Sequence, residues 1–227
     1  MRILGIETAT LTGGAALLDG ERVIGESTLS VALTHSERLM AVIDRLLEDC
    51  RWQAGDLEAI AVSAGPGSFT GLRVGMATAK GLALALELPV VAVPTLDALA
   101  AGLPWADAPV CPVLDARKGE VYASCYRWRG GAAAREWEYL AVAPAELARR
   151  LPRPVILLGD GLAALAPHLG ELGADARVAP PARRLPSAAL VAQLGAVRLA
   201  AGPGDPADAL VPIYVRPSEA ELAAARG

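Results

Sequence analysis

An α/β fold of two similar lobes is the architecture that the sequence predicts, and three observations predict it. The chain has 227 residues, of which 53% are hydrophobic, enough to bury a substantial core. Short apolar runs alternate with longer segments of helical periodicity, which is typical of an α/β sheet. The element order βββαβα begins near residue 2 and again near residue 110, so we expect a duplication with a cleft between the lobes.

The first half opens with three apolar runs that we expect to be strands, at residues 2–8, 14–18 and 23–31. Asp19 and Gly20, between the second and third runs, have the residue types of a two-residue hairpin turn. A helix of about four turns should follow, because Thr34 and Glu37 have the spacing of a capping box and apolar residues then recur at helical intervals.

The rest of the first half repeats a strand–helix pattern twice. We expect a strand at residues 57–64, a long helix from Gly71 to about Leu86, a strand at 89–94 and a short helix capped by Thr95. Pro89 should end the long helix, because proline cannot continue it.

The second half should begin with three further strands, at residues 110–116, 120–128 and 135–142. A helix from Pro144, a strand at 155–159, a short helix from Gly161 and a long helix at 187–200 complete it. The boundary between the lobes is expected near the proline-bearing segment 102–108, so the predicted domains are residues 1–104 and 105–227.

Composition excludes several classes of protein. The formal net charge of −4 lacks the basic surplus of most nucleic-acid-binding proteins. Cys50, Cys111 and Cys125 are too scattered for a disulfide framework or a zinc knuckle, so we expect reduced thiols. His35 and His168 are too far apart for a histidine-based metal site, and no apolar run is long enough to span a bilayer, so we expect a soluble protein.

The segment GPGSFTGLR, at residues 65–73, is the most distinctive in the chain. It follows a predicted strand and opens a predicted helix, where backbone N–H groups and the helix dipole can hold an anion. Ser68, Thr70 and Arg73 are therefore possible anion or cleft contacts. The alternative is a purely structural turn, because the spacing is neither that of a Walker loop nor that of G-x-G-x-x-G.

Small residues recur every four positions in the helix that follows, at Gly71, Gly75, Ala79 and Ala83. Such a stripe lets another helix approach closely. One interpretation is packing within the chain, and the other is an interface with a second chain. The second interpretation predicts the following interface residues: Leu39, Met40, Ile43, Leu47, Gly71, Gly75, Met76, Ala79 and Ala83.

Two carboxylates end the first strands of the two halves, Glu7 and Asp115, and could face each other across the cleft. Paired carboxylates can exchange protons or position a metal-bound nucleotide, and Arg117 could bind an anion there. The alternative is that both are solvated residues at strand ends. We expect no catalytic residue, because the serines lack a nucleophile-elbow context, and no metal site, because the two histidines are too far apart.

The run from Ala64 to Gly75, together with Asp115–Tyr122 (DARKGEVY), resembles the TsaB (YeaZ) family of tRNA threonylcarbamoyladenosine biosynthesis proteins. Further matches are IETAT at residues 6–10, THSERL at 34–39 and PIYVR at 212–216. The resemblance covers nearly the whole chain in order.

This resemblance implies a two-lobed actin-like ATPase fold of the ASKHA, ribonuclease H-like type. It implies a cytoplasmic, non-catalytic subunit that pairs with the paralogue TsaD, or with itself when alone, and acts with the ATPase TsaE. Together these proteins transfer threonylcarbamoyl from threonylcarbamoyl-AMP to N6 of the adenosine beside the anticodon, in tRNAs that read codons beginning with A. The two long helices map onto the helices through which the family dimerises.

The resemblance also bears on ligands. Glu7 stands where many relatives have Asp, so we expect no nucleotide on this chain alone, although ATP or ADP could bind within the complex. The acidic composition predicts that tRNA is contacted mainly by the partners. The alternative function is an autonomous ATP-binding phosphotransferase or a metalloprotease of the same fold, which turnover without partners would reveal.

Overall fold

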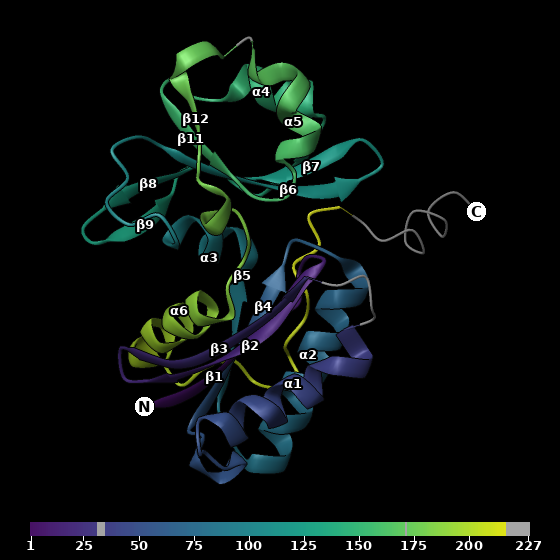
Figure 1. Cartoon of the computed structure of the whole chain (residues 1–227), viewed down its shortest axis with the longest axis vertical. Helices are drawn as coiled ribbons and strands as arrows, with labels where there is room; N and C mark the ends of the chain where they lie inside the picture. Colours follow the sequence, from purple (N-terminus) through teal and green to yellow (C-terminus); the bar gives the residue numbers. More distant parts are fainter. Residues whose placement is uncertain (31–34, 171, 217–227) are drawn as a thin grey trace.

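The computed structural model describes residues 1–30, 35–170 and 172–216, and these form two α/β lobes, one above the other in Figure 1. The lower lobe is built on a five-stranded sheet in the order β3-β2-β1-β4-β5. Its strands are β1 (Arg2–Glu7), β2 (Thr12–Asp19), β3 (Arg22–Ser30), β4 (Ala59–Gly65) and β5 (Val90–Pro94). β2 runs antiparallel to both β1 and β3, and β4 and β5 extend the sheet parallel to β1.

The β2–β3 turn lies one residue later than predicted. Asp19 still pairs with Arg22, so the turn is Gly20-Glu21 instead of Asp19-Gly20. Only Gly20 of these has a left-handed backbone, with φ of 59°. Glycine adopts this conformation without the steric cost of a Cβ atom, so the turn forms around it.

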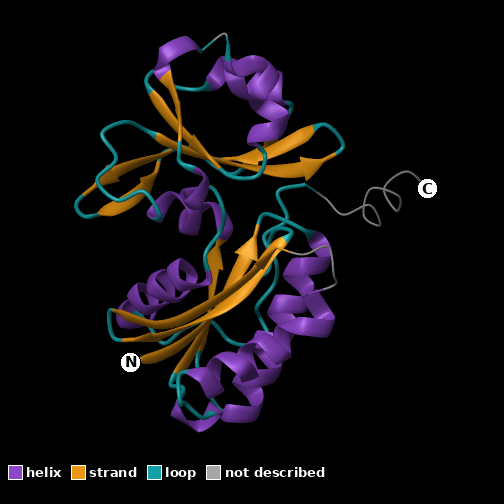
Figure 2. Ribbon diagram, viewed as in Figure 1, coloured by secondary structure: helices purple, strands orange, loops and turns teal. Residues whose placement is uncertain are grey.

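Helices cover both faces of the first sheet (Figure 2). On one face α1 (His35–Asp49) and α2 (Phe69–Leu86) pack on Leu4, Ile6 and Leu17, and on the other α6 (Ala188–Ala201) packs on Ile3 and Ala61. A short 3₁₀ turn, η1 (Ala54–Asp56), follows α1. The capping box predicted at Thr34 lies outside the described residues.

The upper lobe repeats this topology, which confirms the predicted duplication. Its sheet has the order β10-β7-β6-β11-β12, with β8 and β9 added beside β6. The strands are β6 (Val110–Arg117), β7 (Glu120–Ala123), β8 (Tyr126–Arg129), β9 (Ala132–Arg135), β10 (Leu140–Val142), β11 (Val155–Leu158) and β12 (Ala176–Val178). Each strand of the first order therefore has a counterpart in the second, and the β8–β9 hairpin is an insertion.

Two predicted strands of this lobe are each divided in two. The run 120–128 breaks at Ser124, whose hydroxyl donates to the Trp137 carbonyl at 2.8 Å, so β7 pairs with β10 while β8 pairs with β9. The run 135–142 is divided in the same way between β9 and β10. β12 was not predicted, because only three residues form it.

The remaining helices are α3 (Thr95–Ala101), α4 (Pro144–Arg150) and α5 (Leu162–Leu169), with 3₁₀ turns η2 (Gly173–Asp175) and η3 (Pro181–Arg183). Leu147 of α4 and Leu165 of α5 are buried on one face of the second sheet. Thr95 is the first residue of α3 and not its cap, and its hydroxyl forms no hydrogen bond with a described residue.

The packing of two helices differs from the predicted division at residue 104. α3 lies in residues 1–104, yet its Leu96 and Leu99 pack on Val110 and Leu114 of the second lobe. α6 lies in residues 105–227, yet it covers the first sheet, where Gly195 lets it approach Ala61. Because each sheet needs a helix on its second face, the last helix of each half covers the sheet of the other half.

Two expectations from the composition concern the cysteines and the length of apolar helices. Cys111 and Cys125 are buried and Cys50 is half-buried, and all three are free thiols. Within residues 1–30, 35–170 and 172–216, no helix combines the length and the apolar character needed to cross a bilayer.

Candidate functional site

A cavity of about 220 Å³ lies between the lobes and receives residues from both. It is lined by residues 9–11, 67–70 and 114–117, together with Tyr122, Asp160 and Arg216. The first group comes from the β1–β2 turn, the second from the end of the loop before α2 and the first two residues of α2, and the third from the end of β6. The predicted cleft is therefore present.

The loop before α2 is folded tightly onto the β1–β2 turn. Gly65 has a φ of +104°, and the Gly65–Pro66 peptide bond is cis. A Cβ atom at Gly67 would stand 2.8 Å from Ala9 Cβ, closer than such atoms approach. The Ser68 amide donates to the Ala9 carbonyl at 2.6 Å. The glycines of this segment are thus needed for contacts within the chain.

Ser68 caps helix α2. Its hydroxyl accepts a hydrogen bond from the Gly71 amide at 3.2 Å, which satisfies one of the free amides of the first turn. Both its amide and its hydroxyl therefore have partners inside the chain. These contacts favour the structural interpretation of the segment, while Ser68 and Thr70 still line the cavity.

Glu7 ends β1 beneath this loop. Only 1% of it is exposed, and its Oε1 accepts a hydrogen bond from the Ala9 amide. Its Oε2 has no hydrogen-bond partner in the described part of the chain. Burial raises the pKa of Glu7 from its ordinary 4.5 to about 7, although hydrogen bonds from Ala9, Ser63 and Thr8 oppose the shift.

The two arginines that line the cavity are each paired with a carboxylate. Asp115 binds Arg117 at 3.1 Å, and Arg216 binds Glu120 at 2.7 Å. Asp160 accepts a hydrogen bond from the Asp115 amide at 3.0 Å, and burial raises the pKa of its carboxyl. The cavity consequently has no surplus of positive charge for an anion.

Four of the six predicted cleft residues line this cavity, namely Ser68, Thr70, Asp115 and Arg117. Glu7 does not, because its side chain is buried in the core. Both interpretations of Glu7 were therefore wrong, since it neither faces Asp115 across the cleft nor is solvated. Arg73 also lies elsewhere. It is exposed on α2, over the Phe69 ring at 4.1 Å.

Asp160 and Arg216 were not singled out as cavity residues from the sequence. A signal for Asp160 was present, since it follows the end of β11, and β11 runs parallel to β6, whose last residues include Asp115. Carboxyl ends of parallel neighbours meet at one edge of a sheet. Arg216 offered no such signal, because it comes from the chain beyond α6.

The small-residue stripe of α2 is buried within the chain, which corrects the predicted interface. Eight of the nine predicted interface residues are buried: Leu39, Ile43, Leu47, Gly71, Gly75, Met76, Ala79 and Ala83. Only Met40 is exposed, at 50%. The buried residues cover the first sheet, together with Leu210 and the partly buried Ala207 and Ile213 of the segment after α6.

A different face of the helix pair is open. On α2 it consists of Phe69, Arg73, Ala77, Gly81 and Leu84, and Met40 is exposed on the neighbouring α1. At one end of this face Tyr214 contacts the Phe69 ring and accepts a hydrogen bond from Arg73. Leu84 is 80% exposed, and a Cβ at Gly81 would meet no atom within 4 Å. We call these residues the outer helix face.

Comparison with known proteins identifies the family to which this chain belongs. Residues 25–158 match the family described as "TsaD: tRNA N6-adenosine threonylcarbamoyltransferase". The chain is 35% identical over 225 residues to the tRNA threonylcarbamoyladenosine biosynthesis protein TsaB of Bacillus subtilis (strain 168), covering 97% of this chain and 96% of that protein. This chain belongs to the TsaB (YeaZ) family.

TsaB of Escherichia coli (strain K12) is 38% identical over 130 residues, which cover 56% of this chain and 55% of that one. Among solved structures, YeaZ from Pseudomonas aeruginosa superposes with a TM-score of 0.80 at 27% identity, over 94% of this chain and 100% of that one. The activator of the 2-hydroxyisocaproyl-CoA dehydratase from Clostridium difficile, at 13% identity and a TM-score of 0.52, shares the fold alone, covering 88% of this chain and 96% of that one. This chain thus has the actin-like ATPase fold that the family resemblance implied.

Proposed function

We propose that this chain is a non-catalytic subunit of the machinery that makes threonylcarbamoyladenosine on tRNA. It would pair with a TsaD-type transferase and act with a TsaE-type ATPase in the cytoplasm. The observation that carries the proposal is the match to Bacillus subtilis TsaB along 97% of the chain. In this proposal the threonylcarbamoyl group passes from threonylcarbamoyl-AMP to N6 of the adenosine beside the anticodon of tRNAs that read codons beginning with A.

The contacts in the cavity between the lobes support a non-catalytic role. Ser68 is engaged as a helix cap, and the pairs Asp115–Arg117 and Glu120–Arg216 satisfy each other's charge. A general base or a phosphate-binding group needs a free position facing the substrate. In this chain Ser68 and these charged groups are instead bonded to other residues of the chain.

The outer helix face supports a role in assembly. Exposed large apolar side chains that gather on one surface mark sites of interaction more often than single ones do. Met40, Phe69 and Leu84 are 50%, 43% and 80% exposed. A Cβ atom at Gly81 would meet no atom of the described residues within 4 Å, so the surface of α2 there is open to another molecule. We propose this face for contact with TsaD, or with a second copy when the chain is alone.

Association with the TsaD-type protein tests the proposal directly. Leu84→Arg should weaken the complex by at least about tenfold, because a buried interface would have to accommodate an unpaired charge. The matched control is Val197→Arg, since Val197 is 67% exposed on α6, which covers the opposite face of the sheet. Both variants should keep the circular dichroism of the parent chain.

Light scattering of the copurified proteins gives the readout. A complex lost with Leu84→Arg and kept with Val197→Arg supports the proposal. An undisturbed complex with Leu84→Arg contradicts the outer helix face as the interface. Turnover of ATP by the purified chain without any partner would instead favour the autonomous phosphotransferase.

A further inference from the structure

The chain crosses between the lobes twice on one side of the molecule. The first crossing is the segment 102–109, between α3 and β6, and the second is the segment 179–187, between β12 and α6. Gly102 of the first and Leu185 of the second line the same cavity of about 430 Å³, so the two crossings lie together. Crossings that lie together permit one lobe to rotate about the other, so the far side of the cleft needs contacts of its own to stay closed.

A third segment reaches the second lobe on the other side of the cleft. We call residues 205–216 the strap, and Figure 1 shows it in yellow, passing α2 and ending near the second lobe, well away from α3. The Asp205 amide donates to the Val90 carbonyl at 2.8 Å, and Asp205 Oδ2 accepts from the Ala92 amide at 2.8 Å. Leu210 is buried in the core of the first lobe. The strap therefore begins as part of the first lobe.

The strap stays on the first lobe as far as Tyr214. The Ile213 amide donates to the Ala64 carbonyl at 2.7 Å, close to the end of β4. The Tyr214 ring lies 5.5 Å from the Phe69 ring, and its hydroxyl accepts a hydrogen bond from Arg73 Nε at 3.4 Å. These contacts hold the strap at the start of α2, where the first lobe borders the cleft.

Arg216 then joins the strap to the second lobe. Its Nη1 binds Glu120 Oε2 at 2.7 Å, and Glu120 is the first residue of β7. The two side chains are only 29% and 35% exposed, so water screens this pair less than it screens a pair on the open surface. Arg216 also lines the cavity of about 220 Å³ between the lobes. The ion pair therefore connects the lobes beside that cavity.

The two sides of the cleft are distinct. The cavity that Arg216 lines and the cavity that the two crossings line have no residue in common. An attachment on each side fixes the angle between two bodies, whereas attachments on one side alone leave that angle free to vary.

We propose that the strap is a clasp, in which the Arg216–Glu120 pair holds the lobes closed on the side opposite the two crossings. While the pair is formed, the cavity between the lobes stays narrow. When the pair is broken, the second lobe rotates about the segments 102–109 and 179–187 and the cavity opens. The strap itself remains seated, because its other contacts are with the first lobe. This inference does not depend on the proposed function.

A distance between the lobes tests the proposal. Nitroxide labels are attached to the full chain at Ala77→Cys of α2 and Ala163→Cys of α5, which are exposed positions in different lobes. Cys50→Ser prevents labelling of the half-buried native thiol, and an excess of unlabelled chain removes distances between copies. In electron paramagnetic resonance, Arg216→Gln and Glu120→Gln should each shift the distance distribution to longer values and broaden it.

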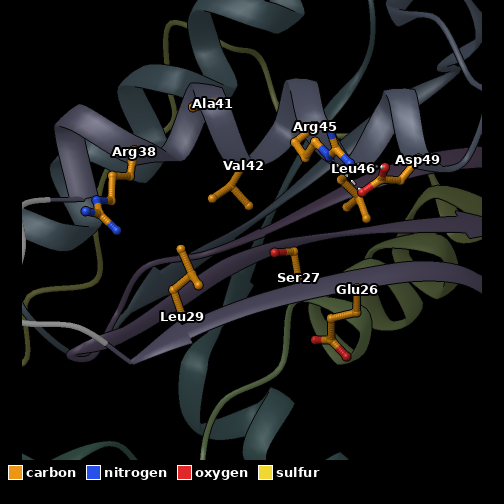
Figure 3. Close-up of a pocket in the computed structure, with 9 residues that line it drawn as sticks. All are labelled: Glu26, Ser27, Leu29, Arg38, Ala41, Val42, Arg45, Leu46 and Asp49. Carbon is orange, nitrogen blue, oxygen red and sulfur yellow. Dashed lines mark hydrogen bonds and ion pairs between the residues drawn. The ribbon is translucent and has the colours of Figure 1, made fainter.

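An ion pair within one lobe provides the matched control. Arg45 binds Asp49 at 3.0 Å on α1, beside a cavity of about 540 Å³ between α1 and β3 (Figure 3). Arg45→Gln removes an arginine–carboxylate pair that does not join the lobes, so it should leave the distance unchanged. The proposal is overturned if Arg216→Gln and Glu120→Gln leave the distance as it is in the parent chain, or if Arg45→Gln changes it equally.

The reversed pair separates the ion pair from other effects of the two residues. Glu120→Arg combined with Arg216→Glu should restore the parent distribution, because the pair forms again with opposite polarity. A reversed pair that stays as open as the single variants would mean that Arg216 acts through another group, and it would overturn the proposal.

Amide exchange separates an open clasp from a detached strap. In Arg216→Gln the Ile213 amide, followed by NMR, should exchange as slowly as in the parent chain, because its bond to the Ala64 carbonyl is kept. Fast exchange of Ile213 together with open lobes would show that Arg216 anchors the strap to the first lobe, which would also overturn the clasp.

Discussion

Gly75 of α2 lies directly against Thr8, the residue that follows β1. A Cβ atom at position 75 would stand less than 3.0 Å from Thr8 Oγ1 and 3.3 Å from Thr8 Cβ. Thr8 is fully buried, so it has no room to yield. Gly75→Ala should therefore lower the free energy of unfolding by about 1–3 kcal/mol, because overpacking outweighs the better helix propensity of alanine. Urea unfolding measures the change.

Gly81 provides the matched control in the same helix. A Cβ there would meet nothing within 4 Å, so Gly81→Ala should raise the free energy of unfolding by about 0.5–1 kcal/mol. If both variants change stability in the same direction, the packing described for α2 is wrong.

The buried carboxyl of Glu7 should make stability depend on pH. Below pH 4.5 Glu7 is protonated in both states, and its contribution to stability is fully present. As pH rises toward about 7, the unfolded chain releases the proton first, so stability falls and then levels off above about pH 7. Each pH unit between the two pKa values corresponds to about 1.4 kcal/mol, which gives a loss of about 3 kcal/mol.

Glu7→Gln isolates this contribution, because glutamine has the same shape and does not titrate. The free energy of unfolding, measured by urea between pH 5 and 8, should fall less steeply in the variant than in the parent chain. Equal slopes in the two proteins would mean that Glu7 is ionised in the folded state, contrary to its burial.

Asp97 of α3 joins the two halves of the chain through two tyrosines. Its Oδ1 accepts hydrogen bonds from the Tyr126 hydroxyl at 2.7 Å and the Tyr139 hydroxyl at 2.8 Å. Tyr126→Phe should lower the free energy of unfolding by about 2 kcal/mol, because the lost bond is to a charged acceptor. Tyr122→Phe, which removes a hydroxyl that bonds to no described residue, should change stability by less than about 0.5 kcal/mol. Equal effects would argue against the role of Asp97.

The cavity between the lobes should not hold a nucleotide on this chain alone. Its volume of about 220 Å³ is below the range of about 300–1,000 Å³ that small-molecule sites occupy, and Arg117 and Arg216 are already paired. Calorimetry with ATP and Mg²⁺ should give a Kd weaker than about 1 mM. Micromolar binding would contradict this description of the cavity.

The sequence predicts the strands and the duplication well, because both depend on local pattern. The runs at 2–8 and 110–116 are continuous apolar segments with turns after them, and both are strands in the structure. The break at Ser124 was not predictable in this way, since it depends on a hydrogen bond to Trp137, 13 residues along the chain. The exchange of α3 and α6 between the sheets is likewise a property of tertiary packing.

The helix pair shows why the predicted interface residues are buried. A stripe of small residues indicates close approach but does not say to what, and here Gly75 approaches Thr8 of the same chain. α2 carries apolar residues on nearly every side, with Ala79 fully buried and Leu84 80% exposed. Only the position of the sheet distinguishes the two faces.

A reconstituted modification assay tests the central claim most directly. tRNA, threonylcarbamoyl-AMP and the TsaD-type and TsaE-type proteins are incubated with this chain, with its Leu84→Arg variant or with neither, and threonylcarbamoyladenosine is measured by mass spectrometry. We predict modification with the parent chain and with Val197→Arg, and a large loss both without the chain and with Leu84→Arg. Full modification in the absence of the chain would contradict its role as a required subunit.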